Sequence, residues 1–127
     1  MSGTLVDLYP SYRRNVHMND SMTPLLKGTV DLLILRSLRQ GPSHGYEVSR
    51  WVRERTGGVF TLEDAALYQA LHRLEERGWV SSEWGLSENN RRAKYYELTP
   101  EGRQRLRNEV SLWKRYAEAV FRIIESA

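Results

Sequence analysis

Apolar residues in the first third of the chain recur at intervals of three and four, the spacing that gives an α-helix one buried face. They are Leu26, Val30, Leu33, Ile34 and Leu38. Thr23 and Pro24 precede this run, and a hydroxyl side chain followed by proline is typical of a helix N-terminus. Gly41 and Pro42 follow it. The pattern predicts a helix that begins at Thr23 and ends at Gly41.

Two further helices are predicted before residue 80. Ser43 is positioned to cap the second helix, which Gly57 and Gly58 end and whose apolar side chains are Tyr46, Val48, Trp51 and Val52. Thr61 precedes Asp64 by three residues, a spacing close to the capping box, and predicts the start of the third helix. One face of this helix carries Leu67, Leu71 and Leu74, and the other carries Ala65, Ala66, Gln69, His72, Arg73 and Glu76. The first face is expected in the core, and the second is free for a partner.

Residues 79–84 and 94–98 alternate between apolar and polar side chains, which predicts two strands of a β-hairpin. The hairpin tip and the start of its second strand carry one asparagine and three cations, Asn90, Arg91, Arg92 and Lys94. The hairpin is therefore expected to have a basic tip.

A last helix is predicted from Thr99 and Pro100 to the end of the chain. Its apolar positions alternate spacings of four and three, which is a heptad seam: Leu106, Val110, Trp113, Ala117, Val120 and Ile124. A helix of this length extends about 42 Å, more than so small a core covers. We expect these six side chains to form the interface of a homodimer.

This order of elements predicts a mainly α (α+β) fold, a winged helix-turn-helix with a long C-terminal dimerisation helix. We divide the chain into an N-terminal extension of uncertain order at residues 1–22, a DNA-binding domain at 23–98 and the dimerisation helix at 99–127. The alternative is an ordinary small α+β domain whose third helix only packs.

The composition removes several function classes. The chain of 127 residues has a net charge of +3 and no cysteine, so disulfides, thiolate metal sites and catalytic thiols are excluded. Three scattered histidines offer no ligand spacing, and the common catalytic motifs are missing, so we expect no metal, no cofactor and no enzymatic activity. The longest apolar run, Leu32 to Leu35, is far too short to cross a membrane, and a cytoplasmic location is expected.

Three separate segments resemble the PadR family of bacterial transcriptional regulators. They are LLKGTVDLLILRSLRQGPSHGYEV at residues 25–48, LYQALHRLEERGWV at 67–80 and SENNRRAKYYELTPEGR at 87–103, in the family's order. The chain has a single helix after the β-hairpin, which is the wing of the winged helix. In this it resembles the shorter subfamily, in which that helix forms the dimer.

The resemblance implies that Tyr68 and the face around Ala66 and Gln69 meet DNA, and that Arg91, Arg92 and Lys94 form the wing. Many relatives have glycine and then serine or threonine before the Leu-Tyr pair, where this chain has Ala65 and Ala66, and many have proline at the position of Gln69. The operator of a relative therefore cannot be transferred to this chain.

The chemistry of these side chains suits A·T-containing steps. Gln69 can pair bidentately with adenine, and Ala65 or Ala66 can contact a thymine methyl group. The alternative for Gln69 is a solvated helix face, and for Tyr68 it is packing rather than a phosphate contact. Lys27 and Arg50 are further candidates for phosphate contacts, with solvated surface charges as the alternative, and for Tyr46 the alternative is packing between the first two helices. The full predicted DNA-binding set is Lys27, Ser43, Tyr46, Ala65, Ala66, Tyr68, Gln69, His72, Arg73, Asn90, Arg91, Arg92 and Lys94.

The sequence thus predicts a sequence-specific DNA-binding transcriptional regulator, a ligand-responsive repressor that binds a pseudo-palindromic duplex DNA operator as a dimer. Trp113 is a costly choice for a dimer seam, because leucine fills such a position better. Two symmetry-related indoles can form a slot for a small aromatic or hydrophobic effector, and Trp113 resembles the tryptophan of the ligand pocket in drug-responsive relatives. The alternatives are that Trp113 only fills the interface, and that the winged helix is a protein-interaction adaptor.

Overall fold

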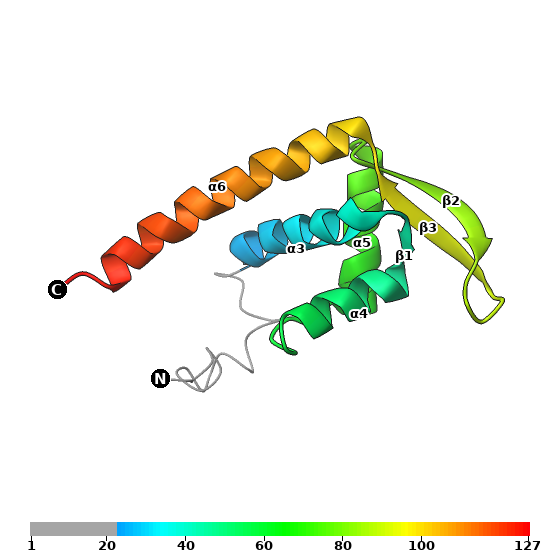
Figure 1. Cartoon of the computed structure of the whole chain (residues 1–127), viewed down its shortest axis with the longest axis horizontal. Coiled ribbons are helices and arrows are strands. Elements are labelled where there is room, and N and C mark those ends of the chain that lie inside the picture. The colour runs from blue at the N-terminus through cyan, green and yellow to red at the C-terminus, as the bar shows by residue number, and fades with distance from the viewer. Residues whose placement is uncertain (1–22) are drawn as a thin grey trace.

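The computed structural model describes residues 23–127, and side chains from residue 28 onward. The N-terminal extension at residues 1–22 and the side chain of Lys27 lie outside the described residues. The elements are α3 (Thr23–Ser37), the 3-10 turn η1 (Leu38–Gln40), β1 (Ser43–His44), α4 (Gly45–Arg55), α5 (Asp64–Glu76), β2 (Val80–Leu86), β3 (Arg92–Leu98) and α6 (Pro100–Ile124) (Figure 1).

The three helices α3, α4 and α5 pack beside a small antiparallel sheet with the strand order β1-β3-β2 (Figure 1). Leucine and valine side chains from all three helices fill the core between them, together with residues of the hairpin, as the periodicity predicts. Leu67, Leu71 and Leu74 of α5 are fully buried there. The predicted winged helix-turn-helix fold is confirmed. Within the described residues, no helix is long and apolar enough to cross a membrane.

The entry to α4 differs from the prediction. Ser43 was expected to cap this helix, but it pairs with Tyr96 in the sheet, and the cap is His44. The backbone N–H of Glu47 donates to His44 Nδ1 at 3.3 Å, and the backbone N–H of His44 donates to Glu47 Oε1 at 3.1 Å. Strand pairing holds the Ser43 backbone extended, so the helix begins one residue later than the sequence suggests.

The start of α5 also differs. Thr61 was expected to cap the helix, but the N-cap residue is Glu63, and its side chain makes no capping hydrogen bond. Leu62 is buried in the core, and its carbonyl accepts a hydrogen bond from the Ser49 hydroxyl at 3.3 Å. These contacts hold the segment before α5 against α4, so the helix begins only at Asp64.

The N-terminus of α6 forms as predicted. The Thr99 hydroxyl accepts a hydrogen bond from the Gly102 N–H at 3.0 Å, with Pro100 in the first turn. Leu106 is only 5% exposed and belongs to the core of its own chain, and Val110 packs against that core. The C-terminal part of α6 extends past α3, away from the sheet (Figure 1). The first two seam positions are therefore occupied within the chain, while Trp113, Val120 and Ile124 are exposed and Ala117 is half-buried.

Candidate nucleic-acid interface

The outward face of α5 is formed by Ala65, Ala66, Gln69 and His72, which the sequence assigned to it, with Tyr68 on its flank, and all five side chains are exposed. His72 Nε2 lies 3.6 Å from Glu76 Oε2 on the same helix. Among the described residues, no group of three potential ligands is placed to hold a metal ion. This face is open to a partner from Ala65 to His72, a little over two turns of the helix.

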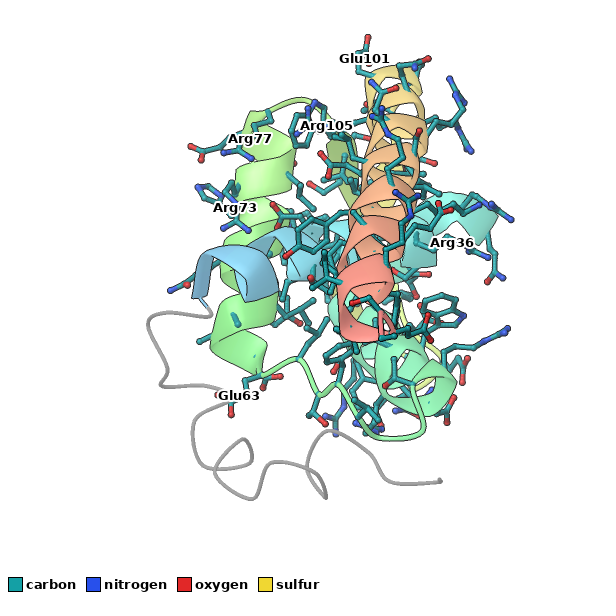
Figure 2. The ribbon with its side chains drawn as sticks, turned by 90° about the vertical axis from the view of Figure 1, so that its left-hand side faces the viewer. Arg36, Glu63, Arg73, Arg77, Glu101 and Arg105 are labelled. Atoms are coloured by element: carbon teal, nitrogen blue, oxygen red, sulfur yellow. The ribbon has the colours of Figure 1, made fainter. Side chains whose placement is uncertain are left out.

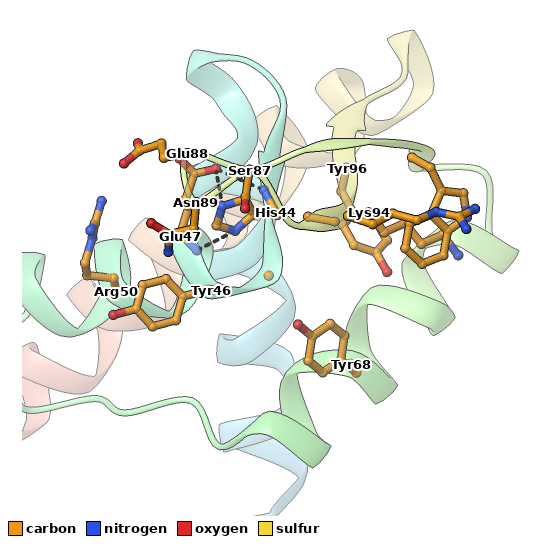
Figure 3. Close-up of a pocket in the computed structure, with 14 residues that line it drawn as sticks. His44, Tyr46, Glu47, Arg50, Tyr68, Ser87, Glu88, Asn89, Lys94 and Tyr96 are labelled. Atoms are coloured by element: carbon orange, nitrogen blue, oxygen red, sulfur yellow. Dashed lines mark hydrogen bonds and ion pairs between the residues drawn. The ribbon is translucent and has the colours of Figure 1, made fainter.

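Tyr68 connects this face to α4. Its side chain is 49% exposed, and its ring lies against Gly45, the first residue of α4. A β-carbon at position 45 would stand 2.7 Å from the Tyr68 hydroxyl oxygen, so the contact requires glycine. Tyr68 thus packs against α4 and also lines the groove described below, so packing and a phosphate contact both stay open for it (Figure 3).

Arg73 does not lie on the open face, contrary to the prediction. Its guanidinium forms a partly buried ion pair with Asp31 of α3. Arg73 points to the opposite side of the molecule from Arg36 (Figure 2). Because Asp31 already compensates its charge, Arg73 stabilises the packing of α5 on α3.

The wing is the hairpin of β2 and β3. In its register Trp84 pairs with Lys94 and Leu86 pairs with Arg92, so these four side chains lie on the same face of the sheet. The Arg92 guanidinium lies 4.5 Å from the centre of the Trp84 ring, in a cation–π contact. Arg92 is thereby held against the hairpin.

The hairpin tip is ordered by its own hydrogen bonds. The Ser87 N–H donates to the Arg91 carbonyl at 2.8 Å, and the Arg91 N–H donates to the Ser87 hydroxyl at 3.3 Å. Asn90 adopts a left-handed conformation with φ of 60°, which asparagine tolerates better than most residues. Both Asn90 and Arg91 are exposed at the tip.

A groove of about 710 Å³ separates the wing from α4 and α5. Tyr46 and Arg50 line it from α4, Tyr68 lines it from α5, and Arg92 and Lys94 line it from the wing (Figure 3). Arg50 stacks over the Tyr46 ring at 5.8 Å. Cations on both walls and hydroxyl groups between them are the groups with which proteins hold a nucleic-acid backbone.

Glu75 joins α5 to both strands of the wing. Its carboxylate accepts a hydrogen bond from the Ser82 hydroxyl at 2.5 Å and lies 3.8 Å from Lys94 Nζ. Burial of the Tyr96 ring, followed by the charge of Glu75 and the nearby Tyr68, raises the pKa of Tyr96 above its ordinary value of 10.0. The negative charge of Glu75 thus lies next to Lys94, one of the cations that line the groove.

Comparison with known proteins identifies the family. Residues 34–108 match the family described as "Transcriptional regulator PadR-like family". The chain belongs to this family.

Solved relatives of this PadR-like regulator share its fold and part of its sequence. A transcriptional regulator from Clostridium thermocellum is 31% identical, with a TM-score of 0.73 over 80% of this chain and 99% of that one. A PadR family transcription regulator from Clostridium difficile is also 31% identical, with a TM-score of 0.67 over 75% and 97% of the two chains. The "Negative transcriptional regulator PadR" of Bacillus subtilis is 27% identical over 58% of this chain and 40% of its own length.

Membership makes the chain a transcriptional regulator, and PadR-like regulators bind DNA and are not enzymes. Within that frame, the structure gathers part of the predicted DNA-binding set around the groove, namely Tyr46, Tyr68, Arg92 and Lys94. The α5 face with Gln69 and the tip with Arg91 lie outside the groove lining, and Ser43 is in the sheet. Their contacts with DNA stay predictions.

Two functional candidates escaped the sequence analysis. Trp84 belongs to the alternating strand, and nothing in the sequence shows that its side chain is exposed and lines the groove. Nothing in the sequence distinguishes Glu75 from the other acids near the end of the third helix. Only its two contacts with the wing, which depend on the fold, distinguish it.

Proposed function

We propose that this PadR-like regulator is a ligand-responsive repressor that binds a pseudo-palindromic operator in the cytoplasm as a homodimer. The groove between the wing and the α4–α5 pair is the observation that carries the DNA-binding part. Its opposing cations, Arg50 on α4 and Arg92 and Lys94 on the wing, suit the sugar-phosphate backbone of a duplex. The name of the Bacillus subtilis relative supports negative regulation.

With one backbone strand in this groove, the outward face of α5 enters the adjacent major groove. Gln69 then reads adenine, and Ala65 and Ala66 contact thymine methyl groups. His72, Asn90 and Arg91 add phosphate contacts around this centre. In this proposal residues 23–98 bind DNA and residues 99–127 form the dimer, which sets two half-sites about 34 Å apart.

Titration of labelled promoter DNA at several salt concentrations tests this assignment. We expect R91A/R92A to weaken binding to all sequences alike and to flatten the dependence of affinity on salt. We expect Q69A to relax base preference by about 1–3 kcal/mol. Binding that does not change with salt would instead favour a protein-interaction adaptor.

The effector part of the proposal rests on an aromatic pair in α6. Trp113 stacks on Tyr116 with ring centres 5.5 Å apart, and the two side chains are 39% and 47% exposed. A planar aromatic or hydrophobic compound can stack on such a pair where two copies of α6 meet. Quenching of tryptophan fluorescence by aromatic cations, and release of DNA, should both fall in W113A. Undiminished quenching and release in a dimeric W113A protein would move the effector site elsewhere.

A further inference from the structure

The three basic side chains that line the groove each lie over an aromatic ring. The pairs, with the distance from the cation to the ring centre, are Arg50 over Tyr46 at 5.8 Å, Lys94 over Tyr96 at 5.9 Å and Arg92 over Trp84 at 4.5 Å. A guanidinium group that lies over the face of a ring keeps the N–H donors at its edge free for another partner. The closest of the three pairs, Arg92 and Trp84, belongs to the wing.

Arg92 has no counter-charge in the part of the chain that the structure describes. None of the ion pairs there involves its guanidinium group, although Glu88 lines the same groove. Lys94, two residues along β3, instead lies 3.8 Å from the Glu75 carboxylate. The charge of Arg92 is therefore available to an anionic group that enters the groove, while the Trp84 ring holds the side chain in place.

Trp84 contributes little to the core of the molecule. Its side chain is 56% exposed, whereas Val80 at the start of the same strand is 2% exposed. Trp84 is neither a core residue nor one of the partly buried side chains that pack against the core. Because little of its surface is buried, removal of its ring should cost the fold little free energy. An effect of Trp84 on DNA binding can therefore be measured in a folded protein.

The strand that carries Trp84 is fixed from the opposite face of the hairpin. A β-carbon at Gly85 would stand 3.2 Å from two carbons of the Tyr95 ring, and the Tyr95 hydroxyl donates to the Leu86 carbonyl at 2.8 Å. The Tyr95 ring in turn meets the ring of His44, the cap of α4, edge-on with centres 5.3 Å apart. These contacts hold the backbone around Trp84, so its ring is a firm platform for a cation.

We propose that Trp84 is a positioning residue for DNA binding, whose ring holds the Arg92 guanidinium group ready for a backbone phosphate of the duplex. A free arginine side chain loses much rotamer freedom when it binds, and a stack that has already restricted it reduces this loss. Trp84 thus acts on DNA through Arg92. The proposal rests on the DNA binding of the proposed function and assigns one of its phosphate contacts to this pair.

A double-mutant cycle tests the proposal, with the full-length chain titrated against a labelled duplex DNA of mixed sequence at several salt concentrations. We expect R92A to weaken binding and to lower the log–log salt slope by up to about 0.9 for each copy bound. W84A should weaken binding by about twofold to fivefold for each copy, the factor that an exposed cation–π contact supplies. In an R92A background, W84A should have no further effect.

Two conservative variants separate the ring from its apolar bulk. W84F retains a ring face for the guanidinium group, so we expect affinity close to that of the wild type. W84L retains an apolar side chain without a ring, so it should bind as weakly as W84A. L86A is the matched control, because Leu86 is 65% exposed on the same face of β2 and offers no ring, and its affinity should be unchanged. Circular dichroism verifies that each variant is folded.

Several results would overturn the role of Trp84 while leaving DNA binding intact. Affinity unchanged in W84A shows that the stack is not used. An equal loss from W84A in the wild-type and R92A backgrounds shows that Trp84 contacts DNA directly. W84L binding as tightly as W84F, or L86A as weakly as W84A, shows that apolar surface on the wing is sufficient. A wild-type chain that binds no duplex DNA even at low salt contradicts the proposed function itself.

Discussion

The ring of Tyr68 in α5 lies against the α-carbon of Gly45 in α4, too close for any side chain at position 45. A β-carbon there would stand 2.9 Å from two ring carbons. Gly45 is also the first helical residue after the cap formed by His44. The Tyr68 hydroxyl group that borders the groove is thus positioned by Gly45, a residue of a different helix. The packing of α4 against α5 therefore determines where this hydroxyl group lies.

We expect G45A to impair DNA binding without unfolding the protein. Alanine favours a helix by up to about 1 kcal/mol over glycine, and the half-exposed Tyr68 ring can rotate away at little cost. The free energy of unfolding should therefore change by about 1 kcal/mol or less, while the displaced hydroxyl loses its contact with DNA. Urea denaturation and DNA titration measure the two effects separately.

The control for this prediction is G28A, because a β-carbon at position 28 meets no atom within 4 Å. A Y68A background supplies the second comparison. If Tyr68 transmits the effect, G45A has no further effect on DNA binding in that background. An additive loss would show that Gly45 acts without Tyr68.

Gly102 makes the second close approach that a side chain cannot enter. A β-carbon at this position would stand 1.9 Å from the carbonyl oxygen of Trp79, a backbone atom that cannot rotate away. That carbonyl also accepts a hydrogen bond from the Thr99 N–H at 3.1 Å. We expect G102A to lower the free energy of unfolding by about 3 kcal/mol, because α6 must separate from the hairpin. Stability equal to that of G28A in urea would contradict this packing.

The elements predicted correctly depend on information within a few residues. Periodicity placed Leu67, Leu71 and Leu74 in the core, and the Thr99-Pro100 pair marked the start of α6. The errors concern residues whose role depends on a distant partner. Ser43 forms a strand because Tyr96 lies beside it, and Arg73 turns inward because Asp31 does.

The candidate site follows the same rule. The basic hairpin and the open face of α5 are visible in the sequence as clusters of residue type. The groove between them is not, because it depends on how the hairpin leans toward α4 and on the contact of Glu75 with Ser82.

The raised pKa of Tyr96 predicts a loss of stability in alkaline solution. Its pKa in the folded chain is higher than the ordinary 10.0, so folding favours the protonated phenol. The contribution of Tyr96 to the free energy of unfolding is complete at pH values below the pKa of the unfolded chain. It is lost as the pH rises from that pKa toward the higher pKa of the folded chain. The chain has seven tyrosines, so the comparison with Y96F isolates this one. Urea denaturation from neutral pH to above 10 should show a shallower alkaline decline for Y96F, and parallel curves would refute the prediction.

Substitutions of Glu75 distinguish two effects on the wing, the hydrogen bond that positions it and the negative charge beside Lys94. E75Q retains a carbonyl oxygen that accepts the Ser82 hydrogen bond, but it removes the negative charge beside Lys94. The wing then stays in place, and Lys94 is free to neutralise a phosphate. We expect tighter binding to all DNA sequences, with a salt dependence steeper by up to about 0.9 in log–log slope, the value for one additional phosphate contact.

E75A removes both interactions and has the opposite effect. Without the Ser82 hydrogen bond the hairpin keeps its core contacts with α5 but loses a polar contact that fixes its position, so we expect affinity to fall below that of the wild type. S82A provides the matched comparison, since it removes the hydrogen bond and leaves the charge on Glu75. DNA titration of the three variants at four salt concentrations distinguishes the two roles. If E75Q and E75A behave alike, Glu75 acts on the groove through its charge alone. An unchanged salt slope in E75Q would mean that Lys94 gains no phosphate contact when the charge of Glu75 is removed.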